Sequence, residues 1–440
     1  MKKLLLSFSL IALTSAANAQ WTSQATGFLD ASRGIGEIKI VDANTVWAVA
    51  YDGSGAGANV QDFTITTNGG TSWNAKTFDV GDTTLSITNI SPVSATTAWV
   101  GAYDQTNGLG GVFKTTDGGD TWTPQNTTAY TTAGESWFDA VHFWDANVGV
   151  TMGDPAGASG EFEVYRTTDG GATWNAIPPA SMPNPLSGEY GYNGGYIANG
   201  DSFWFTTNKG RLFRTTDRGV TWSVAQAPLT DFGSAAQSGQ ADFSTPNNGC
   251  LLKTVGTTYT FYTTSNGGTT WSTGSTFTGT RRLLSYVPGT NIIVATSAAT
   301  PYGTSVSTDN GTSWTDLEVG GTTQRGVNAF LNTTTGWCGG FNADEFTDGI
   351  FKFTGVLGNQ SFNASKFKVY PNPATSVVTI STPDTDSANL SVTDLSGKVV
   401  MTKSLNGIEN NVDISSLSTG AYFFEVSSNS KKEVIKIVKN

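Results

Sequence analysis

Cysteine and histidine are almost absent from this 440-residue chain, which has two cysteines and one histidine. So few ligating side chains exclude most Cys/His metal sites and any dense disulfide framework, and we expect no metal site and no cofactor. Charged residues are also scarce, at 13% of the sequence, and the net charge is −11. Because an acidic chain repels nucleic acid and anionic lipid, neither is an expected partner.

Long apolar runs are missing as well, with one exception at the N-terminus. The chain starts with a basic end, continues with an apolar run from Leu4 to Thr14 and then has small residues up to Ala19. This order is typical of a secretory signal peptide, and the apolar run is too short to span a bilayer well. We therefore expect residues 1–19 to be cleaved off before Gln20, which leaves a mature chain without a transmembrane segment.

The sequence is rich in glycine, with 52 residues, and it repeats one short motif six times. The motif reads Ser/Thr-x-Asp/Asn-x-Gly-x-Ser/Thr-Trp, and it has the chemistry of a turn. The Asp or Asn side chain can bond backbone amides nearby, glycine accepts a positive φ, and the tryptophan buries a large ring beside the next strand. The six pairs of turn residue and tryptophan are Asn68 and Trp73, Asp117 and Trp122, Asp169 and Trp174, Asp217 and Trp222, Asn266 and Trp271, and Asp309 and Trp314.

Short apolar strands fill the intervals between the motifs. Each repeat unit consists of three strands, the motif and a fourth strand, and the second strands of seven units can be aligned although only six motifs occur. The seventh unit has a third strand at residues 349–353 and no motif after it. The strand that begins at Trp21 resembles the tryptophan-led strand after each motif. We expect Trp21–Gln24 to pair antiparallel with Ile350–Phe353 and to close a ring. A repeat of this length predicts a propeller, and closure by both ends of the chain removes its exposed seam.

The repeated motif resembles the Asp-box, or bacterial neuraminidase repeat, of sialidases, sortilin ectodomains, xyloglucanases and photosystem II stability factors. In those families the box is structural, so the resemblance implies an architecture and leaves the function open. We expect an all-β chain in which residues 20–355 form a seven-bladed β-propeller; an open solenoid or six blades with a degenerate end is the alternative. The boxes lie on one face. The loops between second and third strands and the links between blades lie on the opposite face, called the loop face below, where ligand sites are usual.

The composition changes after a polar linker at residues 356–365. Residues 366–440 alternate short strands with turns, which predicts a small immunoglobulin-like β-sandwich. The Tyr-Pro-Asn-Pro segment at 370–373, the Asp-x-x-Gly-Lys turn at 394–398 and the Leu-x-x-Gly-x-Tyr strand at 417–422 resemble the C-terminal sorting domain (type A) of the type IX secretion system. That resemblance implies the type IX secretion machinery as a partner. It also implies delivery through the periplasm to the outer-membrane surface or the medium.

Arginines are candidates for a ligand site on the loop face. Sialidases, which share the box, place three arginines in the mouth of the propeller with a Tyr/Glu pair and an Asp acid. Arg33, Arg281 or Arg282, and Arg325 precede the first strands of blades one, six and seven. These blades are neighbours in a closed ring, and converging guanidinium groups would suit a carboxylate or phosphate. The sialidase Arg-Ile-Pro signature is absent, however, and the alternative is that these arginines pair with acidic neighbours.

Aromatic residues and carboxylates form a second group of candidates. Trp137 and Asp139 precede the first strand of blade three, and Glu189, Tyr190 and Tyr192 precede that of blade four. Aromatic rings beside carboxylates could stack on a sugar and hydrogen-bond it, or these side chains could pack the loops together.

Asp154 ends the second strand of blade three on the same face. With Asp139 it could form the acid/base pair of an inverting glycosidase, which needs carboxyl groups roughly 6.5–9.5 Å apart. Photosystem-factor propellers often carry Gly-Asp-Pro at this place, and that resemblance implies a structural turn instead.

Three functions remain open at this point. The first is an exported propeller that binds a protein or glycan partner, and the sequence favours it. The second is a glycoside hydrolase, sialidase-like or xyloglucanase-like, so catalysis is undecided. The third is an assembly factor resembling the photosystem II stability family. Cys250 and Cys338 fall in blades five and seven, and we expect them to be unbonded because a blade lies between them.

Overall fold

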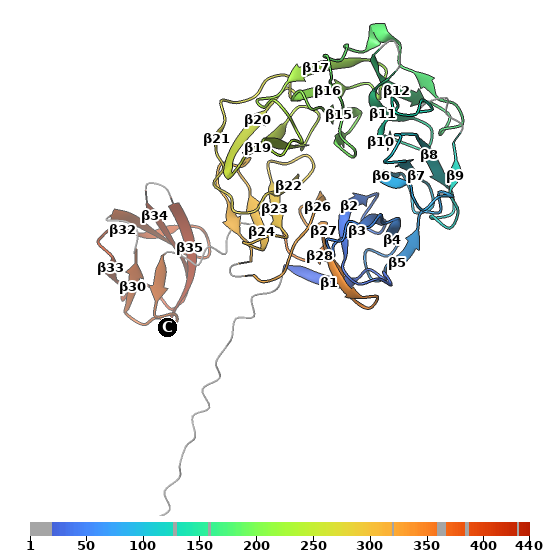
Figure 1. Cartoon of the computed structure of the whole chain (residues 1–440). Coiled ribbons are helices and arrows are strands. Elements are labelled where there is room, and N and C mark those ends of the chain that lie inside the picture. Colours follow the sequence, from blue (N-terminus) through green and yellow to red (C-terminus); the bar gives the residue numbers. More distant parts are fainter. Residues whose placement is uncertain are drawn as a thin grey trace, which may run out of the picture. The chain divides into compact units, whose positions relative to one another are not determined.

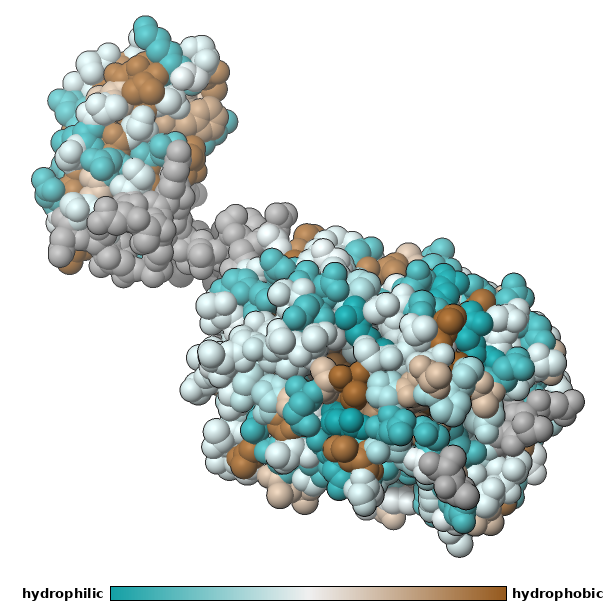
Figure 2. Space-filling view, turned by 90° about the horizontal axis from the view of Figure 1, so that it is seen from above, coloured by the Kyte–Doolittle hydropathy of each residue, from teal (hydrophilic) through white to brown (hydrophobic). Residues whose placement is uncertain are grey.

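The computed structural model describes residues 20–125, 130–156, 160–318, 321–358, 367–382, 387–428 and 431–440, and their regular secondary structure is almost entirely β-strand. The expected signal peptide and most of the expected linker lie outside the described residues. The chain divides after Gly358 into two compact units. The first is a ring of seven antiparallel blades (Figure 1), and the face of it seen in Figure 2 is mostly hydrophilic or intermediate, with apolar residues in separate patches. One 3-10 helix, η1 (Pro179–Ser181), interrupts the strands.

Each blade is a four-stranded antiparallel sheet. Blades one to three consist of β2 (Arg33–Ile40), β3 (Val46–Asp52), β4 (Asp62–Thr66), β5 (Asn74–Thr77), β6 (Ser86–Pro92), β7 (Ala98–Tyr103), β8 (Gly110–Thr115), β9 (Thr123–Pro124), β10 (Phe138–Phe143), β11 (Gly149–Ala156), β12 (Glu161–Thr167) and β13 (Asn175–Ala176). Blades four to six consist of β14 (Tyr196–Asn199), β15 (Ser202–Thr206), β16 (Arg211–Thr215), β17 (Trp222–Gln226), β18 (Ser238–Phe243), β19 (Gly249–Val255), β20 (Thr258–Thr264), β21 (Ser275–Thr276), β22 (Leu283–Tyr286), β23 (Ile293–Ser297), β24 (Gly303–Ser307) and β25 (Thr315–Asp316).

Blade seven is built from both ends of the propeller, which confirms the predicted ring closure. It contains β26 (Asn328–Asn332), β27 (Thr335–Asp344), β28 (Thr347–Phe353) and the first strand of the chain, β1 (Trp21–Ala25). The register pairs Trp21 with Phe353 and Gln24 with Ile350, antiparallel as expected. Figure 1 shows β1 beside β28 at this seam. A further bridge between Gly34 of β2 and Phe341 of β27 joins blade seven to blade one.

The six motif copies, called the repeat turns below, share one hydrogen-bond pattern. In the second turn the Thr115 hydroxyl donates to the Asp117 carboxylate at 2.7 Å, and Asp117 accepts bonds from the backbone N–H and hydroxyl of Thr121 at 3.0 and 2.6 Å. The backbone N–H of Gly119 donates to Thr115 Oγ1 at 2.8 Å, and Gly119 has a φ of +85°, which L side chains rarely adopt. The other five turns repeat the bonds from the first hydroxyl residue and from the residue before the tryptophan.

The tryptophan of each repeat turn packs between its own blade and the preceding one. Trp122 of blade two lies against Phe63 and Phe78 of blade one, with ring centroids 6.0 and 5.2 Å apart. The other repeat-turn tryptophans take equivalent places in the cores between neighbouring blades. The tryptophan of a second strand points toward the following blade. Trp99 of blade two, for example, donates its indole N–H to the backbone O of Gly170 in the repeat turn of blade three, at 3.1 Å. The repeat thus joins blade to blade as well as strand to strand.

The two cysteines lie in different interblade cores. Cys250 is fully buried between blades five and six, and Cys338 is fully buried between blades six and seven. Both are free thiols, as the sequence predicts.

The second unit is a β-sandwich. Its three-stranded sheet contains β29 (Lys368–Tyr370), β30 (Val377–Ser381) and β33 (Glu409–Asp413), and its four-stranded sheet contains β32 (Val399–Asn406), β31 (Ser387–Thr393), β34 (Gly420–Ser428) and β35 (Lys431–Lys439). Inward-facing apolar residues of both sheets form one core, among them Val378, Ile380, Leu390 and Phe424. The alternating pattern of these strands therefore builds a two-layer domain with its own hydrophobic core. No helix in the described part of the chain is long and apolar enough to cross a membrane.

Candidate functional site

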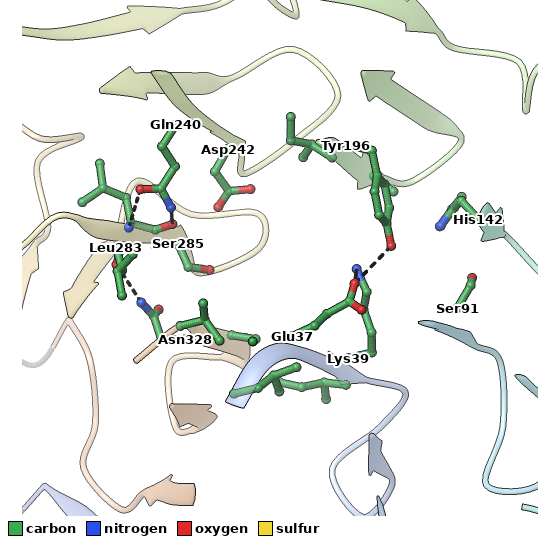
Figure 3. Close-up of a pocket in the computed structure, with 18 of the residues that line it drawn as sticks. Glu37, Lys39, Ser91, His142, Tyr196, Gln240, Asp242, Leu283, Ser285 and Asn328 are labelled. Carbon is green, nitrogen blue, oxygen red and sulfur yellow. Dashed lines mark hydrogen bonds and ion pairs between the residues drawn. The ribbon is translucent and has the colours of Figure 1, made fainter. Parts of the chain in front are cut away.

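Two regions of the propeller gather polar side chains: a channel at the centre and a cluster on the loop face. The channel has a volume of about 490 Å³ and is lined by the innermost strands of the seven blades. Figure 3 shows its labelled residues, with Glu37, Lys39, Tyr196 and His142 on one side and Gln240, Asp242 and Ser285 on the other. The ligand-binding candidates named from the sequence do not line this channel.

Two charged groups of the channel, Lys39 and Glu37, are paired with each other. Lys39 forms an ion pair of 3.0 Å with Glu37, and its ammonium lies 4.6 Å from the centre of the Tyr196 ring. Burial alone would lower the pKa of Lys39, but Glu37 and Tyr196 raise it well above its usual range. Burial, with the charge of Lys39, lowers the pKa of His142 to about 3, so the imidazole is neutral at physiological pH.

Most polar side chains of the channel bridge from one blade to the next. Glu37 of blade one accepts a bond from the backbone N–H of Ile90 in blade two at 2.9 Å. Asp242 of blade five likewise accepts from the N–H of Tyr286 in blade six at 2.6 Å. Burial raises the pKa of Asp242 to about 6 although its backbone hydrogen bonds oppose the rise. These bonds satisfy inner-strand backbone groups, so the channel polarity has a structural role in holding the ring together.

On the loop face the structure brings five of the candidate residues together. They are Trp137, Asp139, Asp154, Tyr190 and Tyr192, which are called the loop-face cluster below. Trp137 joins the cluster through its backbone carbonyl, since its indole ring lies against Gly108 between β7 and β8. The Asp154 backbone N–H donates to Trp137 O at 3.0 Å. The Gly191 N–H, between the two tyrosines, donates to Asp154 Oδ1 at 2.6 Å. The rings of Tyr190 and Tyr192 lie 5.7 Å apart, edge to face. The link between blades three and four is therefore held against the end of β11.

Asp139 and Asp154 interact directly beneath this link. Asp139 is only 3% exposed, and burial raises its pKa well above the usual range, with a further rise from Asp154. Burial also raises the pKa of Asp154 to about 6, although hydrogen bonds from Gly191 and Asp139 oppose the rise. Two carboxyl groups in such contact share a proton near neutral pH. Contact of this kind leaves no room for the water molecule that separates the carboxyl groups of an inverting glycosidase.

Glu189 is fully committed to an internal ion pair. Its side chain accepts bonds of 2.9 and 2.6 Å from the Arg211 guanidinium and one of 2.6 Å from the Thr207 hydroxyl. A second carboxylate anchor follows at Tyr192, whose hydroxyl donates to Asp231. The link that carries Tyr190 is thus fixed at both sides of its exposed aromatic ring.

The candidate arginines each engage neighbours in their own part of the ring. Arg33 pairs with Asp30 and, at 2.9 Å, with Asp62. Arg281, which is 2% exposed, pairs with Asp316. The arrangement matches the alternative in which these residues neutralise acidic neighbours.

The two remaining arginines also have local partners. Arg325 pairs with Glu318 at 2.7 Å and stacks its guanidinium 3.9 Å from the Phe351 ring. The guanidinium of Arg282 lies 3.8 Å from the Tyr259 ring. No group of three or more His, Cys, Asp or Glu side chains among the described residues could hold a metal ion.

Comparisons with known proteins agree with the two-unit architecture. Residues 368–440 match the family model of the secretion system C-terminal sorting domain. Comparison with curated proteins finds no significant match. Among solved structures the chain is similar to "YCF48 bound to D1 peptide", with 14% identity over 76% of this chain and 97% of that chain and a TM-score of 0.51. A likeness at this identity shows a shared fold.

Two further solved structures have lower TM-scores. PorZ, a surface component of the type IX secretion system of Porphyromonas gingivalis, has 15% identity, covers 92% of this chain and 59% of its own length, and has a TM-score of 0.45. The Hadza microbial sialidase Hz136 has 14% identity, covers 74% of this chain and 66% of its own length, and has a TM-score of 0.40.

Fold and sorting domain together define a class of protein. The chain is a β-propeller protein with a C-terminal secretion-system sorting domain. Such a domain directs export, so the protein is delivered to the cell surface or secreted, with the type IX machinery as its carrier.

Proposed function

We propose that this chain is an exported binding protein that recognises a glycan or a protein on the loop face of its propeller. The observation that carries the proposal is the loop-face cluster, in which the Tyr190 and Tyr192 rings lie edge to face on a link that is held by the carboxyl groups of Asp154, Glu189 and Asp231. Tyr190 is 45% exposed, and Trp137 and Tyr192 are half-buried. Aromatic side chains held rigidly in this way supply contact area at low entropic cost.

A glycan is the partner that the chemistry of this surface favours. The flat faces of Tyr and Trp offer apolar area for the C–H groups of a sugar ring, and the polar side chains beside them can fix its orientation. Asn208 adds an amide at the edge: its side chain accepts a bond from the Tyr190 N–H at 2.9 Å and donates to Gly188 O at 3.0 Å. A protein partner stays an outcome of the test, since one structural neighbour is described as bound to a peptide.

Hydrolysis is less well supported than binding. A sialidase-like site needs free guanidinium groups that converge on a carboxylate, whereas Arg33, Arg281 and Arg325 are occupied by ion pairs with acidic neighbours. A xyloglucanase-like site needs separated carboxyl groups, whereas Asp139 and Asp154 are in contact. An assembly role like that of the photosystem stability factors has no observation of its own beyond the shared fold.

The proposal also covers removal of the signal peptide and the type of sequence repeat. Residues 1–19 act as the signal peptide, with cleavage after Ala19, and the repeat turns are Asp-boxes. The turn hydrogen bonds around Asp117 support the second point. Support for the first is that β1 begins at Trp21, so that cleavage before Gln20 would leave the closing strand intact.

A glycan array on the mature full chain, followed by a hydrolysis screen of the bound glycans, tests the function. We expect binding without turnover, and we expect Tyr190→Ala to weaken it at least tenfold. Tyr51→Ala is the matched control, because Tyr51 is 42% exposed and lies at the end of β3 in blade one. Turnover of a bound glycan would overturn the proposal in favour of a hydrolase. Binding that survives Tyr190→Ala and fails with Tyr51→Ala would move the site to blade one.

A further inference from the structure

The Asp139–Asp154 pair has a consequence for the loop that it anchors. We propose that a proton shared by these two carboxyl groups holds the segment 186–195, called the aromatic link below, against blade three, and that loss of this proton releases it. The consequence for partner binding rests on the proposed function, since Tyr190 and Tyr192 lie on this link. Release of the link itself does not.

The contacts around the pair show how one proton can control the link. Asp154 Oδ1 accepts the N–H of Gly191, and the backbone O of Asp139 accepts the N–H of Gly194 at 2.9 Å. The Oδ2 atom of Asp139 is buried and accepts no hydrogen bond from an N–H or hydroxyl donor among the described residues. An added Cβ at Gly191 would lie 2.5 Å from this atom, so the link packs directly on the carboxyl group. A change of charge on Asp139 therefore changes the interaction energy between the carboxyl group and the link.

The groups that face the pair offer no compensating charge. Tyr103 and Tyr130 face Asp139, and their hydroxyls have raised pKa values because they are buried and because Asp139 is near. Both are neutral over the physiological range. Within the described part of the chain, no basic side chain contributes to the pKa of Asp139 or of Asp154. A second negative charge at this place would consequently be buried without a partner, which is costly.

The direction of the pH dependence follows from the proton count. The closed link keeps a proton on Asp154 up to about pH 6 and one on Asp139 well above the usual range. An open link exposes both carboxyl groups to water and returns each pKa toward 3.8. Because the closed state binds more protons, rising pH favours the open state. Between about pH 4 and pH 6 opening releases both protons. Above pH 6, where Asp154 is already ionised in the closed state, opening releases only the proton on Asp139, and the shift amounts to about tenfold per pH unit.

The remaining anchors of the link do not share this dependence. Glu189 is held by the Arg211 guanidinium in an ion pair of 2.6 Å, in which neither Asp139 nor Asp154 takes part. Asn193 donates an amide N–H to Phe138 O at 3.0 Å, and an amide does not titrate. We therefore expect the middle of the link, around Gly191, to open while its start remains attached at Glu189.

Hydrogen–deuterium exchange of the mature full chain between pH 5 and pH 9 tests the inference without any ligand. After correction for intrinsic exchange, protection of the Gly191 and Gly194 amides should fall about tenfold per pH unit above pH 6. In Asp139→Asn the side-chain amide donates to Asp154 at every pH, so protection should stay high and flat. In Asp154→Ala the acceptor is lost, and protection should be low throughout.

Asp242→Asn is the matched control, since Asp242 is another buried aspartate whose pKa is raised to about 6, and it lies in the channel. It should keep the wild-type profile at the link. Constant protection of the wild-type link from pH 5 to pH 9 would overturn the inference, and so would an unchanged pH profile in Asp139→Asn. If Asp139→Asn does not fold, Asp154→Asn carries the same test, because its amide can donate to Asp139. If no glycan binds but the exchange protection of the link falls with pH as expected, the proposed ligand is wrong and the inference about the link stands.

Discussion

The indole N–H of Trp21 donates a hydrogen bond of 2.9 Å to the hydroxyl of Thr304, across 283 positions of the chain. The Thr304 hydroxyl donates in turn to Glu318 at 3.1 Å, and Glu318 pairs with Arg325 at 2.7 Å. The Arg325 guanidinium lies 6.0 Å from the ring of Trp21, so the contacts return to the residue where they began. The first strand therefore completes blade seven and also ties that blade to blade six.

Replacing Trp21 by alanine should open this seam. Trp21 is 3% exposed and packs edge to face against Phe330 and Phe353, at centroid distances of 5.9 and 5.2 Å. Loss of a buried tryptophan costs about 3–5 kcal/mol, and here it also leaves the Thr304 hydroxyl without its donor. Urea unfolding followed by circular dichroism measures the difference. Thr22→Ala, at the exposed position next to it, should change the stability by less than about 0.5 kcal/mol; equal losses in both variants would contradict the role given to Trp21.

The two thiols should be unreactive in the folded protein and free after unfolding. Burial raises the pKa of both Cys250 and Cys338, so little thiolate is present at neutral pH. Alkylation followed by mass spectrometry should show no modification of the native chain and two modified cysteines after non-reducing denaturation. A denatured chain that is lighter by two hydrogens and takes up no label would mean that the two thiols are bonded.

Much of the propeller could be predicted from the sequence because its information is local and repeated. Each repeat turn contains all the side chains of its own hydrogen-bond network, as Thr115, Asp117 and Thr121 illustrate. The count of seven second strands against six turns then implies that a strand comes from elsewhere, and the pairing of Trp21 with Phe353 confirms it. The repeat period and the count of strands without a partner were sufficient to predict the propeller and its closure.

The interiors of the two polar regions could not be predicted in the same way. The Tyr196 hydroxyl reaches Glu37, which lies 159 positions earlier in the chain, and Lys39 lies over the Tyr196 ring. No spacing in the sequence predicts these contacts. The sequence placed Asp139 and Asp154 on one face, but their separation depends on how β10 and β11 twist. A useful signal was nevertheless present. In every blade the first strand places at least one polar residue along the channel, as Glu37, His142 and Asp242 illustrate, and these positions could have been aligned as the second strands were.

Removal of the sorting domain should abolish delivery and leave the propeller intact. The two units are compact by themselves, and the sandwich has its own core around Val378 and Phe424. A chain truncated after Ser365 should therefore keep the thermal transition of the propeller but accumulate in the periplasm. Fractionation into periplasm, cell surface and culture fluid gives the location, and the full-length chain is the control. Normal surface delivery of the truncated chain would show that residues 366–440 are not the export signal.

Acid should weaken the propeller through its repeat turns. Hydrogen bonds from Thr121 and Thr115 lower the pKa of Asp117, and those from Thr173 and Thr167 lower the pKa of Asp169 to about 2. A carboxylate with a lowered pKa in the folded state contributes stability above its unfolded pKa of about 4, and this contribution is lost as the pH falls toward 2. The midpoint of thermal unfolding should therefore drop between pH 4 and pH 2.

Asparagine provides the matched replacement, because Asn68 occupies the same position in the first repeat turn. There its Oδ1 accepts the Thr66 hydroxyl at 2.9 Å and its Nδ2 donates to Ser72 at 2.8 Å, with no charge involved. The double variant Asp117→Asn/Asp169→Asn should thus unfold near the wild-type temperature at pH 7 and lose less stability in acid. Asp79→Asn, an exposed site outside the repeat turns, should keep the wild-type acid profile. If the double variant follows the wild-type profile down to pH 2, the acid sensitivity arises elsewhere, because an amide at these two positions has no proton to gain in that range.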